Sequence, residues 1–235
     1  MKLNYLIKKL EEIKQKGFIS SIRKGPTGIG YLLESELGLS ETNISIPDIG
    51  GRVELKATRR NANSLITLFT FNRSVWKIKL KDVVQKYGYS DASGRISLYT
   101  TVNHKIPNSQ GFFFEADPIK NLIVLRNISE SQNIAEWSTF VIAGKFMIKL
   151  DRLVLVFAGN KTENDKELFH FNEAYLLKNP TPEKFLEAFQ KNEVMIDLRI
   201  HLKPSGAIRN HGTGFRISEK NLVKLYDSKQ QLLYL

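Results

Sequence analysis

The stretch RLVLVFAG, residues 152–159, is an unbroken apolar run of strand length. Such a run suits a strand buried within a sheet, because a strand with one face in water alternates apolar and polar side chains. Apolar residues at helical spacing over residues 129–150 predict a helix before it, and Thr181-Pro182 predicts the start of a helix after it. The chain is therefore predicted to have a mixed α/β fold, with strands and helices interleaved.

Other segments add helices and strands in alternation, without an internal repeat or a low-complexity linker. Apolar spacing predicts helices in three more places: about residues 3–16, IGYLLESEL up to Gly38, and Trp76 to Tyr87. Residue types that favour strands predict a strand in six further segments: NISIPD, RVELKA, residues 64–71, GRISLYTTV, GFFFEAD and NLIVLRN. A long hairpin is predicted over about residues 194–217, where VMIDLRIHL and AIRNHGTGFRI flank a KPSG turn.

The charge of the chain narrows the choice of partner. Its 35 Lys and Arg residues exceed its 24 Asp and Glu residues, which gives a formal net charge of +11. A surplus of this size favours a polyanion, either nucleic acid or an anionic membrane surface. The absence of cysteine excludes disulfides, thiolate metal sites and cysteine nucleophiles.

The first residues, MKLNYLIKKLEEIKQKG, have the pattern of an amphipathic helix and not that of a signal peptide. No apolar run reaches the length that a membrane-spanning helix needs. We therefore expect a cytoplasmic protein without a membrane partner, and nucleic acid becomes the preferred polyanion.

The stretch PDIGGRVELKATRR places two carboxylates and a lysine next to a Gly-Gly turn. Side chains alternate along a strand, so Glu54 and Lys56 share one face while Leu55 faces the core. A three-residue turn, with a glycine in the left-handed region, pairs Asp48 with Glu54 and brings all three polar groups together. We predict this register, or a bulge with the same effect.

These side chains suit the hydrolysis of a phosphodiester. A hard cation can hold the scissile phosphate and make water nucleophilic near neutral pH. Mg2+ takes oxygen ligands, which Asp48 and Glu54 supply, and Mn2+ is its expected substitute. Lys56 adds a compact positive charge that can orient the attacking water. The alternative is a surface salt bridge between Glu54 and Lys56, with Asp48 as a turn residue.

Together, KGPTGIGYLLESELG and PDIGGRVELK resemble the PD-(D/E)xK nucleases, and most of all the branch containing the MutH repair endonuclease and the MvaI/BcnI-type restriction enzymes. On the MvaI/BcnI side the likeness covers nearly the entire chain. It rests on an ordered series of counterparts: KGPTGIG, SLITLFT, KYGYSDASGRISLYTTV, VMIDLRI and NHGTGFRI. Asp…Glu-x-Lys by itself is a weak signal, whereas that series is specific.

The resemblance implies a restriction-endonuclease-like sheet in a two-lobed monomer, which closes around duplex DNA and cuts one strand at a time. It implies a divalent cation held by two carboxylates and a backbone carbonyl, those of Asp48, Glu54 and Leu55. Lys56 is then expected beside the attacked phosphate. The helix acid of this branch maps onto Glu34, with Glu36 as the second candidate.

The expected lobes combine distant parts of the chain. A catalytic lobe is expected from residues 1–90 together with the strand at about 152–159. A DNA-recognition lobe is expected from residues 91–150 and 176–235, including the hairpin.

Six side chains are expected to contact DNA: Lys24, Arg199, Arg209, Asn210, His211 and Arg216. A two-stranded ribbon fits the major groove, where arginine can bridge both acceptors of guanine. In MvaI-like enzymes the counterparts of Arg199, His211 and Arg216 lie at the DNA. Arg209-Asn210 replaces a His-Asp pair of those enzymes and is expected to influence which base pairs are accepted. The alternative for Arg216 is an ion pair with an acid such as Asp197.

The expected function is that of a type II restriction endonuclease, which hydrolyses double-stranded DNA at a short specific sequence. A restriction-modification system then implies a DNA methyltransferase of the same specificity, as a functional counterpart and not as a bound partner. Two alternatives stay open: a MutH-like strand-nicking repair enzyme that waits for another protein, and a DNA-binding module without catalysis.

Overall fold

The structure, a computed structural model, describes residues 2–39, 46–60, 65–71 and 75–234. The chain divides into two compact units, each assembled from segments that are distant in the sequence. Unit 1 comprises residues 1–64, 147–181 and 222–235, and unit 2 comprises residues 65–146 and 182–221. These boundaries differ from those of the expected lobes, because residues 65–90 belong to unit 2 and residues 147–150, 176–181 and 222–235 belong to unit 1.

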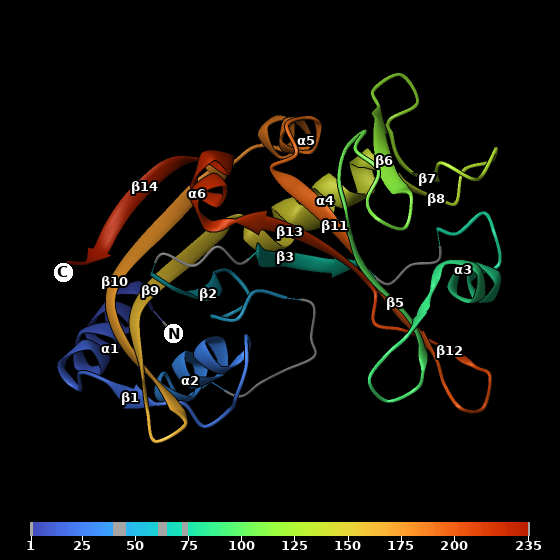
Figure 1. Ribbon diagram of the computed structural model, residues 1–235. Coiled ribbons are helices and arrows are strands. Elements are labelled where there is room, and N and C mark those ends of the chain that lie inside the picture. Colours follow the sequence, from blue (N-terminus) through green and yellow to red (C-terminus); the bar gives the residue numbers. More distant parts are fainter. Residues whose placement is uncertain (1, 40–45, 61–64, 72–74, 235) are drawn as a thin grey trace. The chain divides into compact units, whose positions relative to one another are not determined.

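Unit 1 is built on a sheet with the strand order β1-β10-β9-β2, in which β14 also pairs with β10 (Figure 1). β9 and β10 form a long antiparallel hairpin, and β2 runs parallel to β9. The strands are β1 (Ile19–Ser20), β2 (Glu54–Arg59), β9 (Arg152–Glu163), β10 (Lys166–Pro180) and β14 (Tyr226–Leu233). The predicted strand at residues 152–159 is thus present, and it continues to Glu163.

Two helices, α1 (Leu3–Gln15) and α2 (Gly28–Glu36), cover one face of this sheet. The helical spacing of Leu6, Leu10 and Ile13 gives α1 a single apolar stripe, and all three side chains are buried. The stripe packs into a core that includes Leu55 of β2 and Val154 of β9. Because strand residues alternate, the opposite face of β2 carries Glu54 and Lys56.

Unit 2 contains two sheets, one with the order β3-β13-β11-β5-β4 plus β12 paired to β11, the other with the order β6-β7-β8. The strands of the first are β3 (Leu65–Phe71), β4 (Tyr89–Ser90), β5 (Ile96–Val102), β11 (Val194–Leu202), β12 (Ile208–Asn210) and β13 (Thr213–Ser218). Those of the second are β6 (Phe112–Asp117), β7 (Leu122–Asn127) and β8 (Ala135–Ser138). The predicted hairpin at residues 194–217 is present as β11, β12 and β13.

The helices of unit 2 include α3 (Leu80–Tyr87) and α5 (Pro182–Gln190). The chain passes between the units within α4 (Thr139–Leu150) and again within α6 (Glu219–Leu222), and the 3-10 helix η1 (Val223–Leu225) belongs to unit 1. Aromatic rings form much of the core of unit 2. Phe146 and Phe185 stack with centroids 4.3 Å apart, and Phe69 and Phe215 stack at 4.8 Å.

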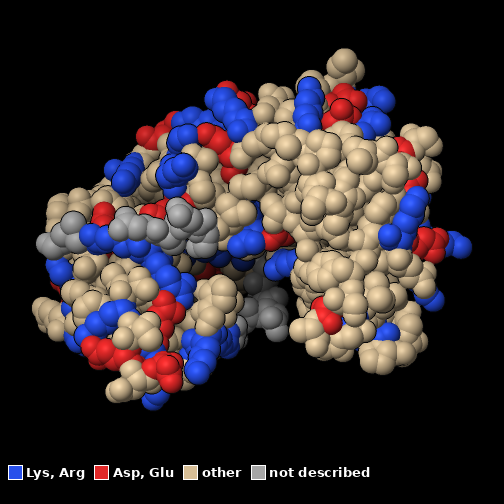
Figure 2. Space-filling model, in the orientation of Figure 1, with Lys and Arg blue, Asp and Glu red and all other residues tan. Residues whose placement is uncertain are grey.

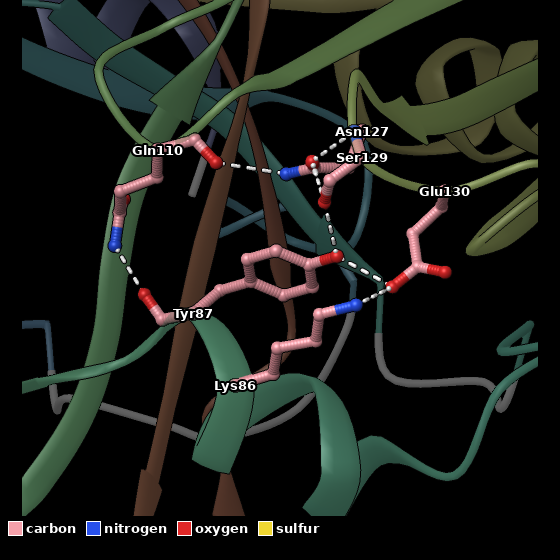
Figure 3. Close-up of polar contacts among 6 residues, drawn as sticks. All are labelled: Lys86, Tyr87, Gln110, Asn127, Ser129 and Glu130. Carbon is pink, nitrogen blue, oxygen red and sulfur yellow. Dashed lines mark hydrogen bonds and ion pairs between the residues drawn. The ribbon is translucent and has the colours of Figure 1, made fainter.

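A polar network fastens the end of α3 to the loop that follows β7 (Figure 3). Its members are Lys86, Tyr87, Gln110, Asn127, Ser129 and Glu130. Glu130 accepts hydrogen bonds from Lys86 (2.8 Å) and from the Tyr87 hydroxyl (2.5 Å). Because the polar groups of this cluster form hydrogen bonds with one another, the network has a structural role in unit 2.

Three predicted elements need correction. The helix expected over residues 129–150 starts only at Thr139, because Ala135–Ser138 pair with β7 as β8. Trp76 lies outside α3 and forms an isolated bridge with Ala135. Of the expected strand NISIPD, residues 43–45 lie outside the described residues, and residues 46–48 form no strand. The remaining predicted helices and strands are present, and the fold is mixed α/β as predicted.

Candidate functional site

The turn before β2 sets the position of Asp48. Ile49 pairs with Val53, so Gly50, Gly51 and Arg52 form a three-residue loop. Gly50 and Gly51 both lie in the left-handed region, with φ of 61° and 68°, which side chains with a Cβ rarely adopt. The antiparallel register continues to place Asp48 opposite Glu54, and the predicted register is confirmed.

Glu54 is the first residue of β2 and is only 1% exposed. Its Oε1 atom lies 2.6 Å from Nζ of Lys56 and 3.4 Å from Nζ of Lys149. Its Oε2 atom is buried and has no hydrogen-bond partner among the described residues. One carboxylate oxygen therefore faces two ammonium groups, and the other is left without a donor. A buried polar atom in this state is costly unless something else binds it.

Burial raises the pKa of Glu54, and the nearby Asp48 carboxylate raises it further. The Lys56 and Lys149 ammonium groups lower the same pKa without outweighing burial. We call Asp48, Glu54, Lys56 and Lys149 the carboxylate centre. Without a further cation, ionisation of both carboxylates of this centre is therefore unfavourable.

Asp48 is exposed, and its Oδ2 atom accepts a hydrogen bond of 2.9 Å from the Leu55 backbone N–H. Because the Leu55 side chain is buried in the core, this bond ties the carboxylate to a rigid part of the sheet. The buried Oε2 atom of Glu54 and the neighbouring Asp48 carboxylate are hard oxygen donors. They fit a divalent cation such as Mg2+, which needs one or two carboxylates and completes its shell with water or phosphate. No group of three or more His, Cys, Asp or Glu side chains arranged for a metal occurs among the described residues.

Lys149 is a charged member of this centre that the motif did not indicate. It lies in the last turn of α4, far along the chain from β2, and its side chain is 20% exposed. No local sequence pattern predicts that Lys149, at the end of an apolar helix, lies close to Glu54 in a strand distant along the chain. In the sequence, Lys149 is separated by Leu150 and Asp151 from the buried strand β9, which pairs with β2.

Glu34, Glu36 and Lys24 lie around α2. Glu36 forms an ion pair of 2.6 Å with Lys16, whereas Glu34 is half-buried on the helix that packs against β2. Lys24 is exposed in the loop before α2. That loop is tied to β2, because Arg59 contacts the Gly25 carbonyl at 3.5 Å.

The second set of predicted side chains lies on one face of the larger sheet of unit 2. Along β11, Ile196, Leu198 and Ile200 are buried in the core, so the alternate residues form the opposite, polar face. Thr101 and Tyr99 of β5 pair with Asp197 and Arg199 of β11 and add to this face. We call this set of residues the polar face of unit 2: Thr70, Tyr99, Thr101, Asp197, Arg199, His201 and Arg216.

Hydrogen bonds connect most of the polar face. Arg216 donates from Nη1 to Asp197 at 2.5 Å and from Nη2 to the Leu65 carbonyl at 2.7 Å. Asp197 also accepts from Thr101 at 2.8 Å, and Arg199 donates to Thr70 at 2.9 Å. The ion pair between Arg216 and Asp197, stated above as an alternative, is present in the structure.

Gly214 lies next to Arg199 and Asp197. A Cβ at Gly214 would lie 3.4 Å from Nη2 of Arg199 and 3.5 Å from Cβ of Asp197, which are distances of ordinary van der Waals contact. Close packing therefore does not by itself explain the glycine in HGTGFRI.

Arg209, Asn210 and His211 are exposed where β12 leads into β13. The Asn210 side chain accepts a hydrogen bond from the Gly212 N–H at 2.8 Å, and Gly212 has a φ of 83°. The His211 N–H donates to the Arg199 carbonyl at 2.9 Å. This turn presents the side chains of Arg209 and His211 outward beside β11.

Charges of both signs intermingle on the face of unit 1 that Figure 2 shows, around α1, β1 and α2. The ion pairs of unit 1 include Lys9–Glu12 and Arg59–Glu167. The positive surplus of the chain is therefore not gathered into a single patch on that face. No helix of the described residues is both long and apolar enough to cross a membrane.

Comparisons with known proteins agree on one group. Residues 7–226 match the model of the MvaI/BcnI restriction endonuclease family. A solved structure described as "Restriction endonuclease MvaI-cognate DNA substrate complex" is 25% identical, with a TM-score of 0.83 over 99% of this chain and 100% of that chain. A second, "Restriction endonuclease MvaI in the absence of DNA", is 24% identical, with a TM-score of 0.56 over 98% and 97%. No curated protein matches the chain. The predicted restriction-endonuclease-like fold is confirmed.

Proposed function

Because the chain belongs to the MvaI/BcnI restriction endonuclease family, we propose that it is a type II restriction endonuclease dependent on Mg2+. It hydrolyses double-stranded DNA at a short specific sequence and acts as a monomer that cuts the two strands in succession. One observation carries the proposal: Asp48 and Glu54 lie opposite each other beside Lys56, and a buried oxygen of Glu54 lacks a donor.

Each residue of the centre has a distinct role. Asp48, Glu54 and the Leu55 carbonyl would hold Mg2+, and Glu34 is the helix acid of the family motif. When bound, Mg2+ supplies a Lewis acid that polarises the phosphate and lowers the pKa of water. Lys56 offsets negative charge that develops on the phosphate and orients the attacking water. Lys149 shares Oε1 of Glu54 with Lys56 and leaves Oε2 for the cation.

The polar face of unit 2 and the adjoining turn recognise the DNA sequence. Arg199 and Arg216 carry the planar guanidinium groups that suit guanine in the major groove. Arg209, Asn210 and His211 project from the turn beside them. Lys24 contacts the sugar-phosphate backbone. The host cell then requires a methyltransferase of the same specificity, which acts on the DNA separately.

The proposal is tested by incubating the purified protein with supercoiled plasmid, with Mg2+, with Mn2+ and with a chelator. Discrete linear fragments are expected with either cation and none with the chelator. Sequencing the fragment ends then yields the recognition sequence and the cut position. A transient nicked circle before linear DNA is expected, because one active centre cuts the strands in succession.

Other outcomes would favour the other functions. Nicked circles that never become linear would support a strand-nicking repair enzyme. Tight DNA binding without cleavage under any cation would support a binding module. Asp48→Asn is the matched control, because it keeps the size of the side chain and removes the charge that binds the cation.

A further inference from the structure

Three rings meet on the polar face of unit 2 at the turn between β12 and β13. The Tyr99 hydroxyl lies 3.1 Å from Nδ1 of His201. The rings of Tyr99 and His201 are nearly parallel, 16° apart, with centroids at 6.3 Å. The His211 ring lies 5.3 Å from that of His201 and 6.3 Å from that of Tyr99. His201 is 8% exposed, whereas His211 is exposed.

We propose that Tyr99 and His201 are positioning residues that hold the His211 ring for contact with the edge of a base in duplex DNA. This inference rests on the proposed function, and it deepens that function by separating His211 from the residues that contact phosphate.

The local geometry restrains His211 from two sides. Its backbone N–H donates to the Arg199 carbonyl, which fixes the start of the turn. Its ring lies against the buried ring of His201, whose own orientation is set by the Tyr99 hydroxyl. A side chain held by packing and hydrogen bonds loses less conformational entropy on binding than a free one. His211 is therefore prepared for a directional contact.

The surrounding charges decide what kind of contact that is. Burial, the Arg95 and Arg209 guanidinium groups and the Lys203 ammonium lower the pKa of His201. The Asp91 carboxylate acts in the opposite direction, but it also accepts bonds from Ser93, Arg95 and Ser97.

The pKa of His211 is also lowered, by partial desolvation, by Arg209, by His201, and by Arg199 and Arg95. A neutral imidazole offers one donor and one acceptor and adds no charge. That chemistry suits a base edge, which has a pattern of donors and acceptors, better than a phosphate, which attracts charge. The same cationic neighbours oppose a metal ion between the two imidazoles.

The test uses a pool of short duplexes with randomised central positions, cleaved in the presence of Mg2+ and sequenced at the new ends. The variants are Tyr99→Phe and His201→Phe, which keep the rings and remove the bond between them. Tyr89→Phe is the matched control, because Tyr89 is an exposed tyrosine of β4, next to β5. Both test variants are expected to lose discrimination by about tenfold at one base pair of the recognition sequence, with the other positions unchanged.

A pH series provides a second readout. Protonation of His211 removes its acceptor, so discrimination at that same base pair is expected to hold from about pH 8 to pH 6.5 and to fall below it. In His211→Gln, the ratio is expected to be independent of pH. A ratio of two sequences at each pH cancels effects on the cleavage step itself.

The possible failures are distinguishable. If wild type cleaves no duplex of the pool, the proposed function fails. If wild type cleaves selectively and Tyr99→Phe is unchanged, or loses activity equally on all sequences, the positioning role is wrong while the proposed function stands. Should His201→Phe not fold, as judged by its thermal unfolding, Tyr99→Phe and the pH series decide the question.

Discussion

The carboxylate centre of unit 1 and the polar face of unit 2 differ in how their carboxylates are paired. At the centre, Oε2 of Glu54 is buried without a partner among the described residues. On the polar face, Arg216 and Asp197 bind each other, and further bonds reach Leu65 and Thr101. The centre leaves a carboxylate oxygen without a partner, whereas the polar face pairs both oxygens of its carboxylate and leaves the buried Nε atoms of Arg199 and Arg216 without one among the described residues.

This difference indicates two modes of ligand binding. The centre can add a cation without breaking a bond, because the open oxygen is already in place. The polar face can add DNA only through donors that remain free or by exchanging partners, since two N–H groups of Arg216 are engaged. Affinity for the cation therefore reflects the electrostatics of the centre. Sequence discrimination reflects a balance between bonds within the protein and bonds to bases.

The largest effect is expected from the centre. Asp48→Asn and Lys56→Ala should each slow plasmid cleavage by about a thousandfold or more, because each removes charge that acts on the transition state. DNA binding should persist, since neither residue belongs to the polar face. Single-turnover cleavage and a binding measurement without divalent cation check the two parts separately.

Lys166→Ala is a suitable control, because Lys166 is an exposed lysine at the far end of β10. It should leave the cleavage rate unchanged. If Asp48→Asn and Lys56→Ala cleaved as fast as wild type, the proposed centre would be wrong, and the open oxygen of Glu54 would be a structural feature alone.

The next effect concerns discrimination by the polar face. Arg216→Lys keeps the positive charge but removes the planar guanidinium group. The variant should therefore lose about 1–3 kcal/mol of discrimination at one base pair. Cleavage rates of duplexes that differ at single positions provide the measurement. A uniform loss over all sequences would instead assign Arg216 to phosphate.

Asp197→Asn sharpens the same comparison. If Asp197 holds Arg216 in place, the asparagine variant should lose discrimination at the same base pair as Arg216→Lys. If DNA must displace Asp197, the variant should bind cognate DNA more tightly. We expect the first result, because Arg216 is also held by the Leu65 carbonyl and has N–H groups left over.

Local patterns were enough to predict the turn and strand that form the centre. The turn signal Gly50-Gly51 and the alternation through residues 54–56 involve neighbouring residues only. The register that they predict, with Ile49 paired to Val53, is observed. The burial of Glu54 and the approach of Lys149 could not be read in this way. Both depend on α4 and on the pairing of β2 with β9, which join distant segments.

The long strand β10 shows why part of the sheet was missed. Phe169 and Phe171 point into the core with α1 and α2, and so do Ala174 and Leu176. A register shift between Phe171 and Glu173 moves the apolar positions from odd to even numbers. The bulge therefore breaks the period of two by which a strand is recognised in sequence.

Lys149 should have a smaller effect than Lys56, because it lies 3.4 Å from Oε1 of Glu54 whereas Lys56 lies 2.6 Å from it. Lys149→Met should slow cleavage by about tenfold and weaken Mn2+ binding, since an opposite charge nearby favours the ionised carboxylate. Lys149→Arg should restore most of both. Titration of Mn2+ followed by electron paramagnetic resonance measures the binding part without cleavage. Equal rates for wild type and Lys149→Met would limit Lys149 to packing.

The smallest expected effect is on stability. It tests whether the unpartnered Oε2 atom of Glu54 lowers the free energy of unfolding. Burial raises the pKa of Glu54 above its ordinary value of 4.5, so the folded state holds this proton more tightly than the unfolded state. Stability from Glu54 is therefore present below pH 4.5 and is lost as the pH rises through the raised pKa. Glu54→Gln should be inactive, yet at neutral pH without divalent cation it should gain about 0.5–2 kcal/mol of stability.

Thermal unfolding near pH 7.5 and near pH 4.5 separates this effect from a general one, because the gain should vanish at the lower pH. Added Mg2+ should stabilise wild type and not Glu54→Gln, as expected when only one of them binds the ion. A variant less stable than wild type at neutral pH would mean that the ion pairs with Lys56 and Lys149 outweigh burial. The Glu54 carboxylate would then be satisfied like that of Asp197, and the contrast between the two regions would disappear.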